Sequence, residues 1–201
     1  MTLCIIQARL GSTRLPRKAL KWLGDQCVID HVLDRVEEIP SVDHYVLAVP
    51  TGDADIHAWA TEIPGDPNDV LGRFVKVLED WPDADTIVRV TGDCPLLNPE
   101  VCERVIQLYR ATPGCEYAWT NTRDGDWPDG LDCEVFSADA LRWAHRMTQH
   151  PYDREHVTPW IRRNCKSVSL PPDPKFHGGP KVSIDTMEDY ERVKQMVEEG
   201  C

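Results

Sequence analysis

The sequence has little positive charge and no long apolar run. It contains 22 Lys and Arg residues against 34 Asp and Glu residues, giving a formal net charge of -12 and a pI near 4.9. Nucleic acids and anionic membranes need an extended excess of positive charge, so we expect neither as a partner. No apolar stretch approaches the roughly 20 residues of a membrane span, and residues 1–24 lack the pattern of a secretory signal. We therefore expect a soluble, cytoplasmic protein.

The cysteines lack the spacing of a metal site. None is arranged as CxxC, which argues against bound zinc. Disulfide frameworks are typical of short secreted chains rather than of a chain of 201 residues. We expect reduced thiols that act as small core residues. The eight are Cys4, Cys27, Cys94, Cys102, Cys115, Cys133, Cys165 and Cys201.

Acidic residues are absent from residues 1–24, although this stretch carries five Lys or Arg. Residues 3–6 form an apolar run typical of a buried strand, and a turn of small residues follows. The turn exposes backbone N–H groups, and Arg9, Arg14 and Lys18 can bond to phosphate oxygens. The stretch matches neither GxxxxGK[ST] nor GxGxxG. It predicts a strand that delivers a triphosphate-binding loop, with a solvated basic turn as the alternative.

Apolar periodicity predicts an α/β protein. Helices are expected over residues 28–39, 55–61, 68–79, 138–147 and 187–199, with another beginning at Asn98 and one running from Arg154 or Thr158 to Asn164. Strands are expected over residues 3–6, 45–49, 86–90, 117–122, 131–136, 166–170 and 182–184. The alternation, without a repeat or an interdomain linker, points to one domain spanning residues 1–201. We expect a three-layer α/β/α fold around a mixed, mostly parallel sheet.

Two aspartates directly follow predicted strands. Asp93 comes after the strand at residues 86–90, and Asp185 comes after the one at residues 182–184. Ligands collect where the carboxyl ends of parallel strands meet. Two carboxylates there can share a Mg²⁺, a hard cation that prefers oxygen ligands and phosphate. Taken singly, each is equally a turn or helix-capping aspartate.

Two other polar segments are candidates for acceptor binding. Asp132 and Glu134 alternate along a predicted strand, so both face one side and can hold substrate hydroxyls or a second metal. A solvated acidic edge is the alternative. Arg154 can pair with a carboxylate or phosphate, and His156 can donate to a ligand or act as a general base. A helix-start salt bridge with a core histidine explains them equally well.

Six sequence blocks occur in a fixed order along residues 3–193: IIQARLGSTRLPRKAL, GDPNDVLGRF, VRVTGDCPLL, DGLDCEVF, REHVTPWIRRN and VSIDTMEDYERV. Together they resemble the cytidylyltransferase-like family named for spore-coat polysaccharide synthesis. A more distant similarity is to the 3-deoxy-manno-octulosonate and acylneuraminate cytidylyltransferases. The resemblance implies a Rossmann-like nucleotide-diphospho-sugar transferase fold. It also implies an enzyme that couples CTP to a sugar acid or related acceptor with Mg²⁺ and releases pyrophosphate, with a homodimer as one expected assembly.

The resemblance further implies roles for individual residues. The nucleotide and its phosphates would contact Ala8, Arg9, Gly11, Ser12, Thr13, Arg14 and Lys18, and the base and ribose would lie near Arg73, Thr91 and Gly92. Mg²⁺ would bind Asp93 and Asp185. The acceptor would lie near Asn121, Asp132, Glu134, Arg154 and His156. Arg9, Lys18 and Asp93 would act directly in catalysis.

The loop departs from its relatives at one position. They often carry Gly before the loop lysine, whereas this sequence has Arg17 before Lys18. Arg17 restricts the backbone or adds a phosphate contact. The stretch after Val49 is also shorter than in larger relatives, which puts a complete central βα unit in question. A glycosyltransferase that consumes a nucleotide sugar and a non-catalytic nucleotide-binding protein are the alternative functions.

Overall fold

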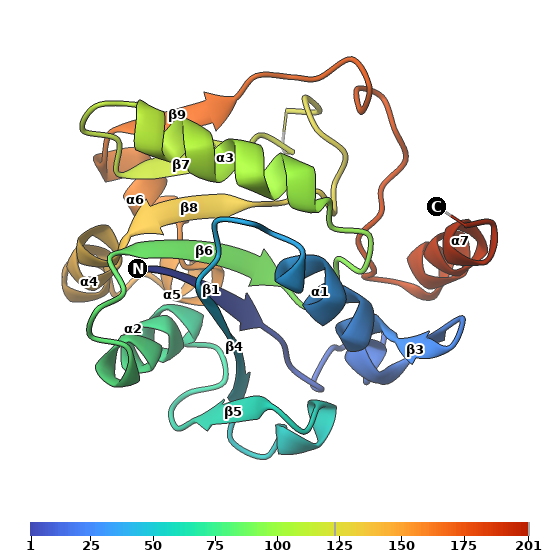
Figure 1. Ribbon diagram of the computed structural model, residues 1–201. Coiled ribbons are helices and arrows are strands. Elements are labelled where there is room, and N and C mark those ends of the chain that lie inside the picture. The colour runs from blue at the N-terminus through green and yellow to red at the C-terminus, as the bar shows by residue number, and fades with distance from the viewer. Residues whose placement is uncertain (123, 201) are drawn as a thin grey trace.

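A mixed seven-stranded sheet forms the centre of the protein, whose computed structural model describes residues 1–122 and 124–200. In sheet order the strands are β5 (Ala60–Ile63), β4 (His44–Pro50), β1 (Thr2–Gln7), β6 (Thr86–Thr91), β8 (Glu134–Ser137), β7 (Tyr117–Thr120) and β9 (Ser167–Leu170). The first four are parallel neighbours, and only β8 runs antiparallel to those beside it (Figure 1).

Helices cover both faces of this sheet. On one face, α1 (Val28–Glu37) and α3 (Pro99–Ala111) pack against alternate side chains of β1, β4 and β6 (Figure 1). On the other face lie α2 (Val70–Asp80), α4 (Ala138–Met147) and α6 (Pro159–Asn164). The amphipathic patterns predict these helices because each buries one apolar stripe. The expected three-layer α/β/α fold is therefore confirmed.

A smaller apolar cluster attaches the C-terminal helix α7 (Met187–Glu198) to the N-terminal region. Leu15, Leu23 and Ile184 are buried in it with Val193 of α7. Leu23 belongs to a short hairpin of β2 (Trp22–Leu23) and β3 (Gln26–Cys27), which follows the 3₁₀ turn η1 (Lys18–Leu20). This packing brings the segment before α7 next to the N-terminal loop.

Tertiary pairing overrides two predicted elements. The helix expected over residues 55–61 is wrong: only the 3₁₀ turn η2 (Ala54–Ile56) forms, and β5 follows, with Leu47 of β4 opposite Ala60. The strand expected over residues 182–184 does not join the sheet. Instead, Val182 N donates to Asp129 O at 2.7 Å and Ile184 N donates to Asp93 O at 2.9 Å. Isolated backbone bonds to loops replace a strand ladder there.

Several element boundaries also differ from the predictions. Of the two starts predicted for the helix that ends at Asn164, Thr158 is observed as the N-cap of α6, whereas Arg154 belongs to a separate helix, α5 (Pro151–His156), before a tight turn at Val157. The strand predicted over residues 131–136 begins only at Glu134, so Asp132 lies in the preceding loop. Thr186, rather than Asp185, caps α7, accepting from Asp189 N at 3.2 Å. The Asp185 side chain is therefore available for other contacts.

The cysteines and helices agree with the expectations drawn from composition. The seven described cysteines are free thiols, and Cys4, Cys94, Cys102 and Cys133 are buried. Cys201 lies outside the described residues. Within residues 1–122 and 124–200, none of the helices is both long and apolar enough to cross a membrane.

Arg17 supplies a stability test because it adopts the left-handed conformation, with φ 55° and ψ 31°. That conformation is strained for residues with a Cβ and relaxed for glycine. We expect Arg17→Gly to raise the free energy of unfolding by about 1 kcal/mol in urea titrations. Arg17→Ala keeps the Cβ and is the matched control, with an expected change near zero. A less stable glycine variant would contradict this assignment of strain.

Candidate active site

A cleft of about 380 Å³ opens at the carboxyl ends of the central strands β1 and β6. Its walls come from the loops after these strands, from α2 and α5, and from the segment before α7. The two loops meet closely, since Gly92 N donates to Gln7 O at 2.8 Å. A Cβ at Gly92 would lie 2.8 Å from Ala8 Cβ, so only glycine fits. The volume suits a small molecule, whose sites span roughly 300–1,000 Å³.

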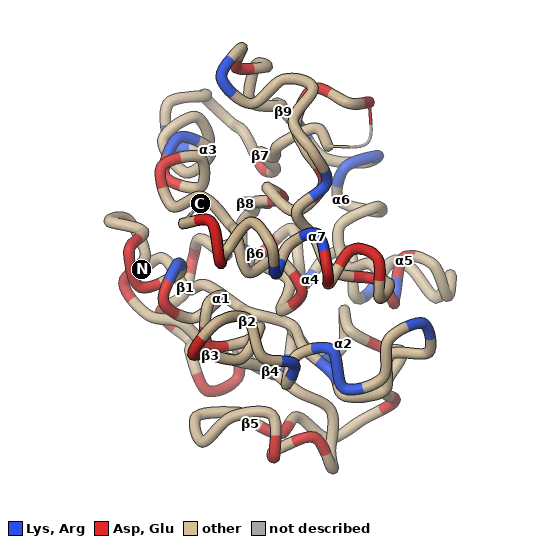
Figure 2. Tube along the Cα trace, turned by 90° about the vertical axis from the view of Figure 1, so that its right-hand side faces the viewer, with Lys and Arg blue, Asp and Glu red and all other residues tan. Residues whose placement is uncertain are grey.

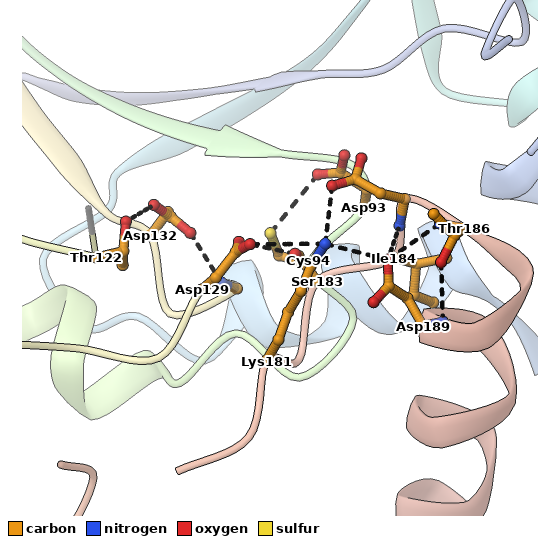
Figure 3. Close-up of polar contacts among 12 residues, drawn as sticks. Asp93, Cys94, Thr122, Asp129, Asp132, Lys181, Ser183, Ile184, Thr186 and Asp189 are labelled. Carbon is orange, nitrogen blue, oxygen red and sulfur yellow. Dashed lines mark hydrogen bonds and ion pairs between the residues drawn. The ribbon is translucent and has the colours of Figure 1, made fainter. Parts of the chain in front are cut away.

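Lys18 connects three distant segments at the bottom of this cleft. Its Nζ lies 2.6 Å from Asp93 Oδ2, 3.2 Å from Asp185 Oδ1 and 2.7 Å from the Ile184 carbonyl oxygen. The backbone bond from Ile184 to Asp93 holds the two acidic segments together (Figure 3). The expected proximity of Asp93 and Asp185 is thus observed, although only Asp93 follows a strand of the sheet.

The ammonium group and its carboxylates stabilise one another's charges. Burial lowers the pKa of Lys18, but the bonds and charges of Asp93 and Asp185 outweigh it and raise the pKa above its ordinary value. Burial raises the pKa of Asp185, yet Lys181 and Lys18 together hold it below the usual range. Lys181 Nζ lies 3.0 Å from both Asp185 and Asp189. Lys18 and Asp185 are therefore both charged at neutral pH.

Asp93 and Asp185 offer carboxylate oxygens as metal ligands around the position that the Lys18 ammonium group occupies. Among residues 1–122 and 124–200, no group of three or more His, Cys, Asp or Glu side chains can hold a metal ion. Mg²⁺ commonly uses one or two carboxylates and takes its other ligands from water and substrate phosphates. The donor set of this chain therefore fits Mg²⁺ accompanied by a phosphorylated substrate.

Four more cations line the cleft, one of which, Arg89, is paired with Glu134. Arg14 is exposed at the rim, 3.0 Å from Asp185. Arg9 reaches Asn68 at 3.4 Å and Glu155 at 3.6 Å, spanning the space between α2 and α5. Arg73 is buried and donates to the Pro67 carbonyl at 3.0 Å. In the charge-coloured trace, basic and acidic segments lie beside one another around α2 and α7 (Figure 2).

Most residues predicted for the site line this cleft. They are Ala8, Arg9, Ser12, Thr13, Arg14, Lys18, Arg73, Thr91, Gly92, Asp93, Asp132, His156 and Asp185. Gly11 belongs to the same loop but is not among the lining residues. The cleft also contains residues that sequence reasoning missed: Gln7, Arg89, Asp129 and Ser183. Gln7 directly precedes the predicted loop, whereas Arg89 reads as an ordinary strand position and carries no sequence signal.

Glu134 does not line the cleft, contrary to the role expected for it. It forms an ion pair with Arg89 and accepts bonds from Tyr117 Oη at 2.6 Å and Thr158 Oγ1 at 2.7 Å. Burial raises its pKa, but Arg89 and the two hydroxyls outweigh burial and keep the pKa below its ordinary value. A carboxylate with these contacts positions other residues rather than contacting an acceptor.

Arg154 and Asn121 are also placed away from the lining of the cleft. Arg154 pairs with Asp69, the N-cap of α2, and donates to the His145 carbonyl at 3.2 Å. Asn121 donates to Asp124 at 2.8 Å and to Asp126 at 3.1 Å. Both side chains connect local segments through these bonds, although Asn121 Oδ1 is buried without a hydrogen-bond partner among the described residues.

The turn between α5 and α6 connects the cleft with the Glu134 network. Val157 has φ 68° and ψ -61°, and Thr158 N donates to His156 O at 2.8 Å, which is the rare, strained γ-turn. His156 lines the cleft on one side of this turn, and Thr158 bonds to Glu134 on the other. Strained backbone of this kind persists only where surrounding contacts impose it.

The network predicts a large cost for neutralising Glu134. Glu134→Gln leaves the Arg89 charge buried without its partner, so we expect a loss of about 3 kcal/mol in the free energy of unfolding, measured in urea. Glu198→Gln, on the exposed end of α7, is the matched control and should change stability little. Equal stability of the two variants would show that Arg89 finds another partner.

Comparison with known proteins agrees with this geometry. The sequence matches the family model described as cytidylyltransferase over residues 3–199. It is 33% identical over 215 residues to the spore coat polysaccharide biosynthesis protein SpsF of Bacillus subtilis, covering 98% of this chain and 87% of SpsF. It is 35% identical over 124 residues to 3-deoxy-manno-octulosonate cytidylyltransferase of Maricaulis maris, covering 58% of this chain and 47% of that enzyme.

A solved structure shows the same similarity. A cytidylyltransferase from Leptospira borgpetersenii superimposes with a TM-score of 0.88 at 26% identity, covering 100% of this chain and 87% of that one. The resemblance found in the six sequence blocks is thereby confirmed. Since the family model covers nearly the whole sequence, the chain belongs to the cytidylyltransferase family.

Proposed function

We propose that this protein transfers CMP from CTP to a sugar acid or related small anionic acceptor and releases pyrophosphate. The product would serve in the synthesis of a surface polysaccharide or glycoconjugate precursor. The observation that carries the proposal is Lys18 held between Asp93 and Asp185 in the cleft beside the N-terminal loop. The loop cation Lys18 can bind a polyphosphate, and the two carboxylates beside it can bind the metal ion that accompanies the polyphosphate. SpsF, the relative from spore-coat polysaccharide synthesis, supports the pathway class.

The reaction is an in-line displacement in which an acceptor oxygen attacks the α-phosphorus of CTP. Lys18 and the rim cations Arg9 and Arg14 stabilise negative charge on the phosphates, and the loop after β1 positions them through backbone N–H groups. The bond from the α-phosphorus to the bridging oxygen breaks, and pyrophosphate leaves with that oxygen. Positioning and electrostatics supply most of the acceleration in this class of transfer.

Asp93 and Asp185 would hold Mg²⁺, with further oxygen ligands from CTP. Bound there, a divalent cation neutralises phosphate charge and polarises the α-phosphorus. Lys18 sits between the same two carboxylates, so its ammonium group must give up one of these contacts when the carboxylates bind a metal. Lys18 thus alternates between pairing with the carboxylates and pairing with phosphate oxygens.

Asp132 and His156 would contact the acceptor. Of the five residues predicted for this role, these two line the cleft. Burial raises the pKa of Asp132, partly offset by bonds from Thr122 Oγ1 and Gly130 N. Its carboxylate is held by the loop before β8 and is positioned to accept a hydrogen bond from an acceptor hydroxyl.

A pyrophosphate-release screen tests the function directly. The four NTPs are combined with sugar acids, sugar phosphates and phosphonates in the presence of Mg²⁺. We expect release with CTP and one acceptor class, and loss of at least about 100-fold in rate in Asp93→Asn because an essential charge is removed. Asp83→Asn, exposed in the turn at the opposite end of β6, is the matched control and should keep wild-type activity.

Three results would contradict the proposed reaction, and a fourth would contradict only the metal site. Absence of pyrophosphate with every pair would argue against a nucleotidyltransferase, and CTP binding without turnover would favour the non-catalytic alternative. Release of a nucleoside diphosphate or monophosphate from a nucleotide sugar would favour a glycosyltransferase. Near-normal turnover of Asp93→Asn would show that Asp93 is not a metal ligand, without contradicting the class of reaction.

Lys18 also makes a prediction about metal binding without nucleotide. Lys18→Met removes the competing ammonium group, so Mn²⁺ affinity should rise about 10-fold, as expected for losing roughly 1.4 kcal/mol of competition. Titrations of free Mn²⁺ followed by electron paramagnetic resonance measure this affinity. Lys21→Met, whose ammonium lies 5.1 Å from the Tyr190 ring, is the control. Unchanged affinity in Lys18→Met would indicate that Asp93 and Asp185 do not form the metal site.

A further inference from the structure

One part of the cleft lies on the face of the sheet covered by α2 and α5. Side chains alternate along β1, and Leu3 and Ile5 are buried on this face, so Gln7 continues the same row. Ile87 of β6 is buried on the same face, and Arg89, two residues further along this strand, therefore also points to it. Val70 and Arg73 of α2 and Glu155 of α5 line the cleft on this side. We call this group the α2–α5 compartment.

Arg89 fixes the orientation of the Gln7 amide. Arg89 Nε donates to Gln7 Oε1 at 3.0 Å. An arginine N–H can only donate, so the amide atom facing it must be the oxygen. Arg89 cannot turn away, because its guanidinium is ion-paired with Glu134, which Tyr117 and Thr158 hold in place. The Gln7 oxygen is therefore held toward Arg89, and the NH₂ group is the end of the amide turned away from it, where it can donate to a ligand.

The rest of the compartment suits an uncharged, flat group. The charge of Arg89 is balanced by Glu134, and Arg9 crosses from Asn68 to Glu155. The guanidinium plane of Arg73 can stack on a ring. The phosphates belong at the other part of the cleft, where Lys18 meets the carboxylate pair. This leaves the α2–α5 compartment for the base.

We infer that Gln7 determines base specificity by donating a hydrogen bond from Nε2 to N3 of the cytosine ring, with Arg89 as the residue that positions it. The inference rests on the proposed function and assigns a base contact within it. At N3 cytosine accepts a hydrogen bond, whereas uracil carries an N–H and cannot. An amide free to flip would accept from uracil equally well, so the bond from Arg89 is what makes Gln7 selective.

Calorimetric titration of CTP and of UTP, each with Mg²⁺, tests this assignment. The quantity compared is the ratio of CTP to UTP affinity within one variant, which partial unfolding does not change. Wild type should prefer CTP. Gln7→Leu removes the donor and should lower the ratio about 5- to 10-fold, as for one hydrogen bond.

Gln7→Glu separates base recognition from support of Arg89. Its carboxylate keeps an oxygen for Arg89 Nε but presents only acceptors to the base, so the ratio should fall at least about 10-fold. Gln195→Leu, on the exposed side of α7, is the matched control and should keep the wild-type ratio. Thermal unfolding of each variant confirms that the protein titrated is folded.

The outcomes are distinct from those of the proposed function. Ratios that stay at the wild-type value in both Gln7 variants would overturn the inference, even in an enzyme that releases pyrophosphate from CTP. A wild type that binds CTP and UTP equally would also overturn it. Failure of the pyrophosphate screen, by contrast, would count against the reaction and leave base selectivity to be decided by the titrations.

Discussion

The three-way contact of Lys18 with Asp93 and Asp185 holds the functional end of the protein together. Asp93 lies 75 positions and Asp185 lies 167 positions from Lys18 in the sequence, and both carboxylates form salt bridges with Lys18 Nζ. Each carboxylate depends on a different part of the fold: Asp93 on β6, and Asp185 on the segment between β9 and α7. The N-terminal loop, the central sheet and the C-terminal helix are thus fixed relative to one another at the point where a phosphorylated substrate would bind.

A second set of buried charges supports the other side of the cleft. Glu134 satisfies Arg89, and Arg89 in turn orients Gln7, while Thr158 extends the network through the strained turn at Val157. Burying an ion pair is costly unless every partner is bonded, which this arrangement achieves. These contacts hold the side chains of Arg89 and Gln7 in one orientation before a ligand binds.

The errors made from sequence have a common physical cause. Glu134 and Arg154 look like substrate ligands because charged residues rarely enter a protein interior without a reason. The reason proved to be internal: each pairs with a charge from a distant segment, Arg89 or Asp69. In the same way, residues 60–63 pair with β4 rather than forming a helix. Arg17, which departs from the family pattern, adopts a left-handed backbone conformation that glycine adopts without strain.

The sequence by itself determined the α/β class, the cluster of cations in the first loop and the position of Asp93 after a strand. Apolar periodicity and residue type are local properties that can be read from neighbouring residues along the chain. Only the tertiary structure decided that Lys18 meets both carboxylates, that Glu134 pairs with Arg89 and that Arg89 fixes the orientation of the Gln7 amide. Each of these depends on which distant side chain completes a buried polar contact, and no local pattern records that pairing.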